Sequence, residues 1–406
     1  MSTLKYWLWL MTRKGVDVRS ALQLLEYFSV PERIYYADES DYEPVPISSA
    51  AKRGLLDKRL DEADRILGEC ERLGVRILTI QDAEYPQRLK QIALPPPVLY
   101  IRGRLPRFDE EAAIAMVGAR KSSEYGRRYA QRLGMELAAG GALLVSGIAE
   151  GIDGHAIRGA LMGGGRVVSL LGGGTDVIYP KQHRELYEDV AAAGALISEY
   201  PPGTPNAGEH FPKRNRIISG LSLGVLAVEC KRASGTMTTI RHAQDQDRDI
   251  FAVPGSLDAP MSEGTNWLIQ RGAKLVTCGE DILVEYRDRF PQKLNKSLPA
   301  PTVKARLERL ARHISAEVKK EKPQKTKPEE RRKPVIPRGK QKSRFTDDGL
   351  AVLFALGEKS YTIDELVEQT QIPTRRVLSA LTVLQIDGAV EELSGKRFAS
   401  LVTLEE

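Results

Sequence analysis

Seven short apolar runs, separated by stretches of helical length, occupy the middle of the chain and constrain its fold more than any other feature. Strands that are apolar on both faces, each followed by a helix, are typical of a parallel sheet covered by helices on both sides. The sequence therefore predicts a doubly wound α/β domain. The apolar runs are Ala113–Val117, Ala142–Val145, Arg166–Leu171, Ala195–Ile197, Gly224–Val228, Asp249–Val253 and Lys274–Thr277.

Four segments are expected along the 406 residues. Residues 1–85 carry apolar side chains at spacings of three and four, which predicts a small helical domain of the SAM or helix-hairpin-helix kind. Residues 86–290 hold the α/β domain, residues 291–344 a linker, and residues 345–406 a compact C-terminal domain. The expected fold class is α/β, with a doubly wound and mostly parallel sheet.

The positive charge of the chain is concentrated in one segment. Residues 291–344 contain 18 lysines and arginines against 5 glutamates, whereas residues 345–406 have a net charge of −6. The basic segment also contains several prolines and little apolar periodicity, so we expect it to be a largely disordered linker. Its charge fits either an electrostatic tether for nucleic acid of any sequence or a solvated spacer.

The C-terminal segment has the pattern of a winged helix. Its expected helices are Leu350–Leu356, Ile363–Gln369 and Arg375–Ile386, and a hairpin with a Ser-Gly turn follows over residues 389–401. Winged helices often read duplex DNA through the third helix, which here offers only Arg375 and Arg376. Because the domain is also acidic, we favour contact with a protein over regulation of duplex DNA.

Several classes of protein are excluded by features that the sequence lacks. No apolar run approaches the ~20 residues of a spanning helix, and no signal peptide is recognised, so we expect a cytoplasmic protein without membrane contact. The three cysteines and five histidines have no metal-binding spacing, and no nucleophile-elbow or His-Glu-x-x-His motif occurs. We therefore expect no metal, no cofactor and no catalytic residues, and hence a protein that is not an enzyme.

Glycine-rich turns follow the first three strands of the predicted sheet. In open α/β sheets, ligands bind beyond the carboxyl ends of the strands, where turns and helix N-termini present N–H groups to anions. Phosphate suits these turns, because glycines allow close approach, hydroxyls donate, and two cations supply charge. The first turn lacks the Gly-x-Gly-x-x-Gly of dinucleotide sites. The candidate ligands are Gly118, Arg120, Ser146, Gly147, Gly172, Gly173 and Lys181.

A second basic stretch, residues 210–220, precedes the fifth apolar run. Arg214, Asn215 and Arg216 lead directly into apolar residues, and we expect them to line the same crevice and follow a sugar-phosphate backbone. Asp153, Glu199 and Glu229 could also lie near the crevice. Such carboxylates more often cap helices or pin neighbouring arginines, so we do not assign them a catalytic role.

Seven motifs in order resemble those of the DNA-processing protein A family, also called DprA or Smf. The resemblance covers about residues 75–285 by motif and extends to the helical and winged-helix segments on either side. The motifs are Val117-Gly-Ala-Arg120, Ser146-Gly-Ile-Ala-Glu-Gly-Ile-Asp153, Gly172-Gly-Gly-Thr-Asp176 with Tyr179-Pro-Lys181, Ser198-Glu-Tyr-Pro201, Phe211-Pro-Lys-Arg-Asn-Arg-Ile-Ile-Ser-Gly-Leu-Ser222, Ser234-Gly-Thr236 and Phe251-Ala-Val-Pro-Gly255.

The resemblance implies an extended Rossmann-like domain that binds single-stranded DNA, dimerises and helps to load the recombinase RecA during natural transformation or homologous recombination. It also implies that Arg120 and Lys181 contact DNA, and it extends this role to Arg214, Asn215 and Arg216. The alternative is a nucleotide-processing enzyme similar to the lysine-decarboxylase-like phosphoribohydrolases. Gly172-Gly-Gly-Thr175 is only a partial match to their glycine motif, and the catalytic glutamate that follows it is missing.

Overall fold

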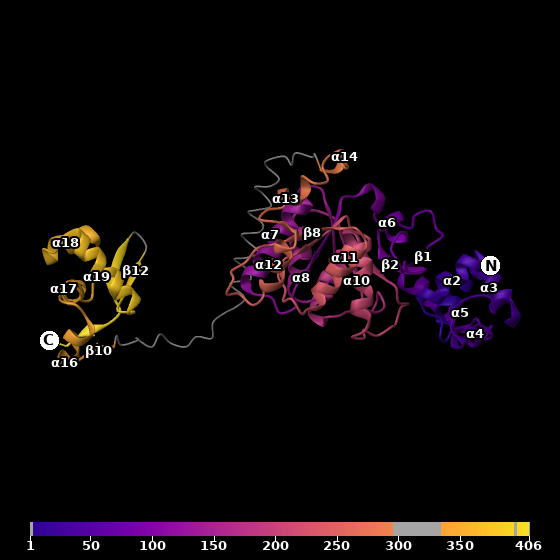
Figure 1. The fold of residues 1–406 in the computed structure, drawn as a ribbon, viewed down its shortest axis with the longest axis horizontal. Coiled ribbons are helices and arrows are strands. Elements are labelled where there is room, and N and C mark those ends of the chain that lie inside the picture. The colour runs from indigo at the N-terminus through magenta and orange to yellow at the C-terminus, as the bar shows by residue number, and fades with distance from the viewer. Residues whose placement is uncertain (1–2, 295–333, 394–395, 406) are drawn as a thin grey trace. The chain divides into compact units, whose positions relative to one another are not determined.

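The computed structural model of the protein describes residues 3–294, 334–393 and 396–405 (Figure 1). The described residues form two compact units, one on each side of residues 295–333. The linker expected at 291–344 therefore lies mostly outside the described residues. No helix within the described part of the chain combines the length and the apolar character needed to cross a bilayer.

The first unit is built on a nine-stranded sheet in the order β1-β2-β6-β5-β4-β3-β7-β8-β9. The strands from β3 to β9 are parallel to their neighbours, whereas β2 pairs antiparallel with β6 and with β1. This confirms the predicted doubly wound, mostly parallel sheet. The strands are β1 (Arg76–Thr79), β2 (Val98–Gly103), β3 (Ala113–Val117), β4 (Leu143–Ser146), β5 (Val167–Leu170), β6 (Ala195–Ser198), β7 (Gly224–Ala227), β8 (Asp249–Ala252) and β9 (Lys274–Leu275).

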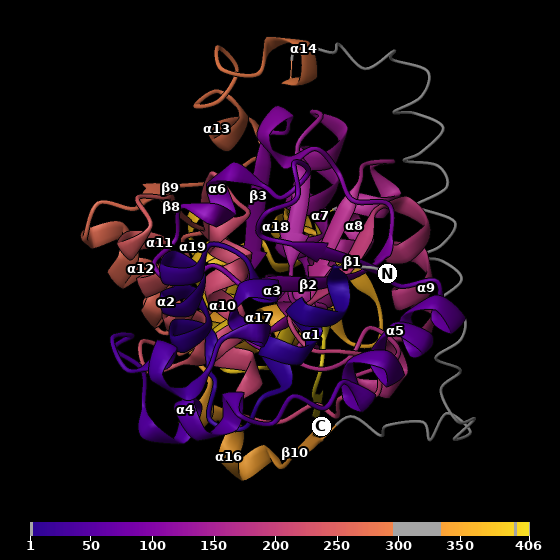
Figure 2. The same ribbon diagram turned by 90° about the vertical axis from the view of Figure 1, so that its right-hand side faces the viewer.

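Helices cover both faces of this sheet, because alternate residues of each strand point to opposite sides. In β3, Ala113, Ala115 and Val117 join one core, while Ile114 and Met116 join the other. One core includes helices α10, α11 and α12, and the other includes α7, α8 and α9 (Figure 2). The six helices are α7 (Glu124–Ala139), α8 (Ile152–Met162), α9 (Arg184–Ala193), α10 (His210–Gly220), α11 (Gly235–Asp245) and α12 (Glu263–Gln270).

Short helices complete the first unit around the sheet. Three of them precede or follow strands, and two more come after β9. They are α6 (Gln87–Lys90), η2 (Phe108–Glu110), η3 (Lys181–His183), α13 (Glu280–Leu283) and α14 (Pro291–Leu294). The last of these lies within the expected linker, where Leu294 is buried in the core that contains α7.

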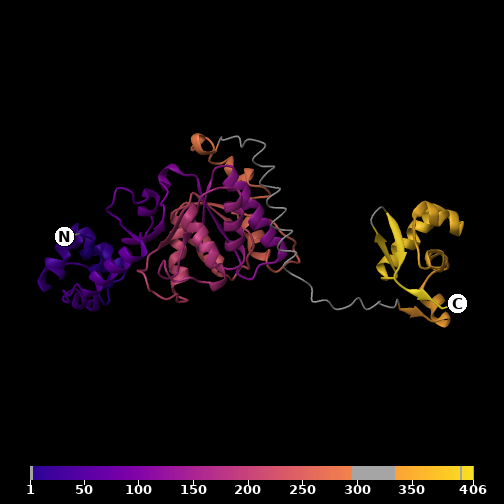
Figure 3. The same ribbon diagram turned by 180° about the vertical axis from the view of Figure 1, so that it is seen from behind.

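The N-terminal segment is helical as predicted, and its bundle lies at one end of the first unit (Figure 3). The N-caps Asp17 and Ser48 accept bonds from backbone N–H groups and begin two of its helices. The elements are α1 (Leu4–Thr12), α2 (Val18–Phe28), α3 (Pro31–Tyr36), η1 (Glu39–Tyr42), α4 (Ser49–Leu55) and α5 (Asp61–Leu73).

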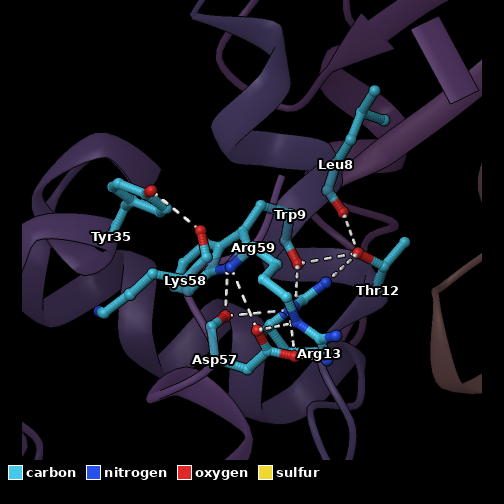
Figure 4. Close-up of polar contacts among 8 residues, drawn as sticks. All are labelled: Leu8, Trp9, Thr12, Arg13, Tyr35, Asp57, Lys58 and Arg59. Carbon is cyan, nitrogen blue, oxygen red and sulfur yellow. Dashed lines mark hydrogen bonds and ion pairs between the residues drawn. The ribbon is translucent and has the colours of Figure 1, made fainter. Parts of the chain in front are cut away.

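Polar contacts join α1 to the loop between α4 and α5 (Figure 4). The Trp9 indole and the Arg13 guanidinium both donate to the carbonyl oxygen of Asp57, at 2.8 and 2.9 Å. The Lys58 ammonium lies over the ring of Trp9, and Tyr35 donates to the Lys58 carbonyl oxygen. These bonds satisfy groups at the end of α1, so the bundle has a fixed internal arrangement.

Strand β1 differs from the expectation for residues 1–85. It pairs with β2 over Arg76–Thr79 and Val98–Ile101 and so belongs to the sheet rather than to the helical bundle. Its core residue Leu78 packs in the same cluster as sheet residues such as Val145. The reason is that an isolated four-residue strand cannot satisfy its own backbone, whereas the edge of the sheet supplies partners.

The second unit is a winged helix with its own apolar core, which contains Leu353, Leu366, Leu381 and Phe398. Its helices bury one face each, and β12 and β13 form the wing. The elements are β10 (Val335–Ile336), α16 (Arg338–Arg344), α17 (Asp347–Leu356), β11 (Ser360–Thr362), α18 (Ile363–Thr370), α19 (Thr374–Ile386), β12 (Val390–Leu393), β13 (Arg397–Ser400) and β14 (Thr403–Leu404).

Residues 334–344 are folded, although the sequence analysis assigns them to the disordered linker. Strand β10 pairs in parallel with β14, and the Gln341 side chain donates to the carbonyl oxygens of Ile336 and Glu405. Ile336 is buried in the core of the winged helix. The composition of this segment does not reveal that it folds, because it has only two apolar residues in a row, between two prolines. The rest of the core in which Ile336 is buried comes from other elements of the winged helix.

Candidate functional site

A crevice opens at the carboxyl ends of β3 and β7, where the order of the strands reverses along the chain. This is the position at which open α/β sheets bind ligands. The cavity has a volume of about 380 Å³. Its walls come from the turn after β3, the N-terminal ends of α8 and α11, and one side of α10. The residues that line it include Gly118, Arg120, Asp153, Phe211, Arg214, Asn215, Lys231, Ser234, Gly235, Thr236 and Met261.

Arg120 is an exposed cation of this crevice. The turn that carries it packs tightly, since a side chain at Gly118 would collide with Ile152 at the start of α8. The same turn is held from below by the buried Glu229, which accepts bonds from the Ser123 N–H and hydroxyl at 2.8 and 2.6 Å. Glu229 thus positions the loop, as the sequence analysis considered for this carboxylate.

Phe211, at the start of α10, is the aromatic centre of the site. The guanidinium of Arg120 lies 4.7 Å from the centre of its ring, and that of Arg214 lies 5.8 Å away. A side chain at Gly172 would press on the same ring. Phe211 is not among the ligands predicted from the sequence. The feature that could have identified it is an aromatic residue two positions before a run of basic residues.

Arg214 lies in the wall of the crevice rather than open to it. Only 4% of the residue is exposed, and its Nη1 donates to the carbonyl oxygen of Leu170 at 2.9 Å. Burial lowers the pKa of Arg214 to about 10, while the nearby carboxylate of Asp153 opposes that shift. Gly147 makes room for the guanidinium, because a methyl group there would collide with it. Arg214 therefore supplies positive potential from below the surface.

Asp153 is the buried counter-charge of Arg214. Its Oδ2 accepts the N–H of Gly147 at 3.1 Å. Burial raises the pKa of this carboxyl, and the Arg214 guanidinium and the backbone bonds hold it down. Asp153 therefore stabilises the turn after β4 through its bond to Gly147, and it provides a negative charge close to Arg214.

Three sequence-predicted ligands do not present a polar group to the crevice. Ser146 is fully buried, and its hydroxyl donates to the Met116 carbonyl oxygen of the neighbouring strand at 2.8 Å. The buried carbonyl oxygen of Gly173 accepts the Ser198 hydroxyl at 2.6 Å. Gly172 lies beneath Phe211, and its carbonyl oxygen contacts the His210 ring at 2.8 Å. The polar groups of these three residues are therefore already engaged in contacts within the fold.

Arg216 faces away from the crevice, which corrects the expectation that it lines the site with Arg214. It pairs with Glu199 at 2.5 Å, with both side chains about nine-tenths buried, and it lines a different cavity next to the N-terminal helices. The reason is helical geometry, because a turn of about 100° per residue places positions 214 and 216 about 200° apart on α10. Asn215, between them, does line the crevice.

Lys181 lies at the same edge of the sheet but outside the cavity. It begins η3, two residues after Tyr179, whose ring lies 5.7 Å from that of Phe211. Its side chain is exposed. Within the described residues, neither Lys181 nor Arg120 forms an ion pair, so both charges are available to a ligand.

The segment after β7 contributes residues that the sequence analysis did not assign to the site. Lys231 is exposed at the rim, and Ser234, Gly235 and Thr236 form the beginning of α11. Asn215 donates to the Gly235 carbonyl oxygen across the crevice at 3.4 Å. A helix N-terminus favours anions, so this wall adds to the charge of Arg120. The Ser234-Gly-Thr236 motif is the feature of the sequence from which this wall of the crevice could have been predicted.

The three carboxylates that the sequence places near the crevice are engaged within the fold. Asp153 faces Arg214, Glu199 pairs with Arg216, and Glu229 holds the turn after β3. In the part of the chain that the structure describes, no three or more His, Cys, Asp and Glu side chains gather as metal ligands would. The arrangement is suited to holding an anion with two exposed cations, an aromatic ring and a helix N-terminus.

Comparisons with known proteins match both described units of the chain. The profile of the DNA recombination-mediator protein A family matches residues 76–287, and that of the DprA winged helix domain matches residues 327–396. The chain is 30% identical over 408 residues to Protein Smf of Synechocystis sp., covering 97% of this chain and 98% of that one. It is 37% identical over 246 residues to DNA processing protein DprA of Bacillus subtilis, covering 61% and 83%. The X-ray structure of DprA from Streptococcus pneumoniae superposes with a TM-score of 0.62 at 32% identity, covering 70% and 99%.

Proposed function

This chain belongs to the DNA recombination-mediator protein A family, and from that premise we propose that it binds single-stranded DNA at the carboxyl edge of its sheet. We further propose that it protects incoming or processed strands in the cytoplasm and helps to load RecA in natural transformation or homologous recombination. In this proposal the protein works without catalysis and without a cofactor.

One observation carries the proposal. Arg120 and Lys181 are exposed cations without ion pairs among the described residues. Arg120 lies over the ring of Phe211, Tyr179 lies beside that ring, and Lys181 comes two residues after Tyr179 in the chain. Exposed cations beside aromatic rings suit a chain of phosphates whose bases are unpaired. Asp153, Glu199 and Glu229 are already committed to arginines and backbone groups, which weighs against their use as catalytic acids or bases.

Gripping the backbone predicts weak dependence on base sequence and a steep dependence on salt, because phosphate neutralisation releases counterions. We expect the protein to bind single strands more tightly than duplex, since only unpaired bases can lie against Tyr179 and Phe211. Fluorescence anisotropy with labelled single-stranded and duplex oligonucleotides at two salt concentrations tests this. Equal affinity for both forms, or no binding to either, would contradict the proposal.

The roles of RecA and of a second copy of the chain are further parts of the proposal. We expect a homodimer, measured by sedimentation velocity at several protein concentrations. We also expect the protein to shorten the lag before RecA assembles on strands coated with single-strand-binding protein. A monomer at all concentrations would contradict the first expectation, and an unchanged lag would contradict the second.

Nucleoside monophosphate hydrolysis is the competing activity. It needs a free carboxylate at the crevice, and the nearby carboxylates are engaged. An assay for release of free base from each nucleoside monophosphate tests it directly. Turnover above the uncatalysed rate would replace the binding proposal with an enzymatic one.

A further inference from the structure

An arginine–tryptophan–arginine cluster lies on the surface next to the crevice. The guanidinium groups of Arg232 and Arg271 lie 5.2 and 5.0 Å from the centre of the Trp267 ring. Trp267 is half-buried on α12, whereas both arginines are exposed. Neither arginine forms an ion pair with another residue in the described part of the chain. We call these three residues the Trp267 cluster.

Tight backbone packing connects the Trp267 cluster to the crevice. The N–H of Gly264, at the start of α12, donates to the Cys230 carbonyl oxygen at 2.9 Å, and a side chain at Gly264 would collide with Cys230 and Lys231. Lys231 and Met261 line the crevice itself. The segment that carries Lys231 and Arg232 is therefore in direct contact with the start of α12, where the exposed Glu263 is the acidic residue among these cations.

The loop before α12 is also held in place. Asn266 accepts the Gly255 N–H and donates to the Gly255 carbonyl oxygen, at 3.1 and 3.0 Å. Trp267 packs against the core on its inner side. A half-buried ring on a helix that is fixed to the neighbouring loop loses little conformational freedom on binding, which favours a role in recognition over an accidental surface aromatic.

The chemistry of the Trp267 cluster points to a nucleotide. An indole stacks on any nucleobase, and two guanidinium groups beside it reach phosphates. An exposed cation–π contact is weaker than base stacking, so a base can replace one guanidinium on the indole and free it for a phosphate. An acidic peptide would use the two charges but would leave the indole without a partner.

We propose that the Trp267 cluster is a second contact for the strand bound in the crevice, where a base stacks on Trp267 and Arg232 and Arg271 bind the adjoining phosphates. This inference rests on the proposed function, because it concerns the path of the same strand. The strand would run from Arg120 and Phe211 past Lys231 to α12. Short oligonucleotides would fill the crevice alone, and longer ones would also reach the Trp267 cluster.

Intrinsic fluorescence gives a direct readout in the full-length protein. Of the three tryptophans, Trp7 and Trp9 are buried in the N-terminal bundle, which leaves Trp267 as the one that a ligand can contact. Oligothymidines of increasing length are titrated while tryptophan emission and the anisotropy of a labelled strand are followed together. We expect quenching with the longer strands and none with strands that fill only the crevice, and we expect Trp267→Phe to abolish the quenching.

Two variants test the affinity contributed by the Trp267 cluster. We expect Trp267→Ala to weaken binding of long strands about tenfold, and Arg232→Ala/Arg271→Ala to lower the salt slope by about 1.4, with little effect of either on short strands. Arg104→Ala/Arg107→Ala, which removes two exposed arginines at the opposite edge of the sheet, is the matched control.

The outcomes separate this inference from the proposed function. If long strands bind as judged by anisotropy, but do not quench tryptophan emission, and the salt slope is the same in wild type and in Arg232→Ala/Arg271→Ala, the inference is overturned and the crevice proposal stands. That result would leave the Trp267 cluster as a surface for a protein. If Trp267→Ala fails to fold, Trp267→Phe and the double arginine variant, which keep the ring or leave it untouched, still decide the question.

Discussion

Arg120 and Arg214 lie against the same phenylalanine ring but differ in what they can bind. Arg214 donates to the Leu170 carbonyl oxygen and faces Asp153 below the surface, so it acts on the crevice only through its electrostatic potential. Arg120 is exposed and keeps its hydrogen-bonding groups for a ligand. Burial therefore separates these two arginines into a structural residue and a candidate binding residue, a difference that residue type does not show.

Gly147 is expected to be intolerant of any side chain. A methyl group there would occupy the space of the Arg214 guanidinium, so Gly147→Ala should lower the free energy of unfolding by about 1–3 kcal/mol, the usual cost of overpacking. Urea unfolding measures this. Gly68→Ala is the control, because Gly68 lies inside α5 with open space around it and should gain about 0.5–1 kcal/mol from helix propensity. Equal effects of the two substitutions would contradict the packing assigned to Gly147.

His183 gives the fold a dependence on pH. Burial lowers the pKa of His183 below its ordinary value of 6.5, and burial does the same for His242. The unfolded chain then binds more protons than the folded one as the pH falls below that value, so stability is kept above it and lost below it.

We expect the free energy of unfolding to fall from about pH 7.5 to about pH 5.5, and to fall less in His183→Gln, whose amide can still donate to the Ile148 carbonyl oxygen. Urea unfolding at both pH values measures this. A fall of the same size in the variant would show that His183 does not titrate in this range.

Sequence alone indicates the two exposed cations of the candidate site, because each comes soon after a buried strand. It misplaces Ser146, Gly172 and Arg216, whose roles depend on neighbours far along the chain. Ser146 satisfies a carbonyl of β3, and Arg216 finds Glu199 on the other side of α10. Phe211 was missed for the same reason, because its importance comes from Tyr179, Arg120 and Arg214 meeting on its ring.

At the scale of elements, the loop between β3 and α7 sets the position of Arg120. Glu229 at the end of β7 accepts two bonds from Ser123, and Ser123 in turn caps α7 by accepting the Gly126 N–H. One buried carboxylate thus joins two neighbouring strands and a helix N-terminus. A substitution of the buried Glu229 is therefore expected to alter the binding of DNA by the exposed Arg120.

Glu229→Gln is expected to weaken binding of single-stranded DNA severalfold. An amide cannot accept both bonds from Ser123, and a buried donor left unpaired costs about 1–3 kcal/mol. Removing a negative charge would by itself strengthen binding to a polyanion, so weaker binding would identify a positioning effect. The measurement is anisotropy with a labelled oligothymidine, with unfolding by urea to verify the fold. Tighter binding in the variant would contradict this role.

The strands from β3 to β8 are predictable because they are buried on both faces and read as apolar runs. The pattern over residues 74–80 also predicts a short strand, which is β1, but not its partner. Strand β2 reads only as an extended connection, since prolines flank it and its pairing is fixed by the antiparallel edge of the sheet. Strand β10 is too short to be seen in the sequence at all. Its place depends on β14, almost seventy residues later.

At the scale of the whole molecule, charge is distributed unevenly between the parts of the chain. The segment 345–406 has a net charge of −6, and the chain as a whole has +6. The third helix of the winged helix exposes Leu378 and Val383, and its Arg376 is paired with Asp348. These features favour contact with a protein over contact with DNA.

Deleting residues 334–406, the whole described winged-helix unit, raises the formal charge from +6 to +8 and leaves the crevice complete. We expect the truncated protein to bind single-stranded DNA at least as tightly as the full chain at low salt, with the difference disappearing as salt screens the charge. Anisotropy at increasing salt measures this. A loss of affinity at every salt concentration would mean that the winged helix carries a DNA contact.

The central claim is that Arg120 and Lys181 hold a DNA backbone at the carboxyl edge of the sheet. The most direct test is the salt dependence of oligothymidine binding by Arg120→Ala/Lys181→Ala, beside Arg104→Ala/Arg107→Ala. The two double variants lose the same charge, but residues 104 and 107 follow Gly103, which pairs with the first residue of β6 at the amino edge.

We predict that Arg120→Ala/Lys181→Ala binds at least about tenfold more weakly, with a salt slope smaller by about 1.4, while the control variant binds as the wild type does. Equal affinities and slopes in the two folded variants would contradict the claim and move the DNA site away from this edge.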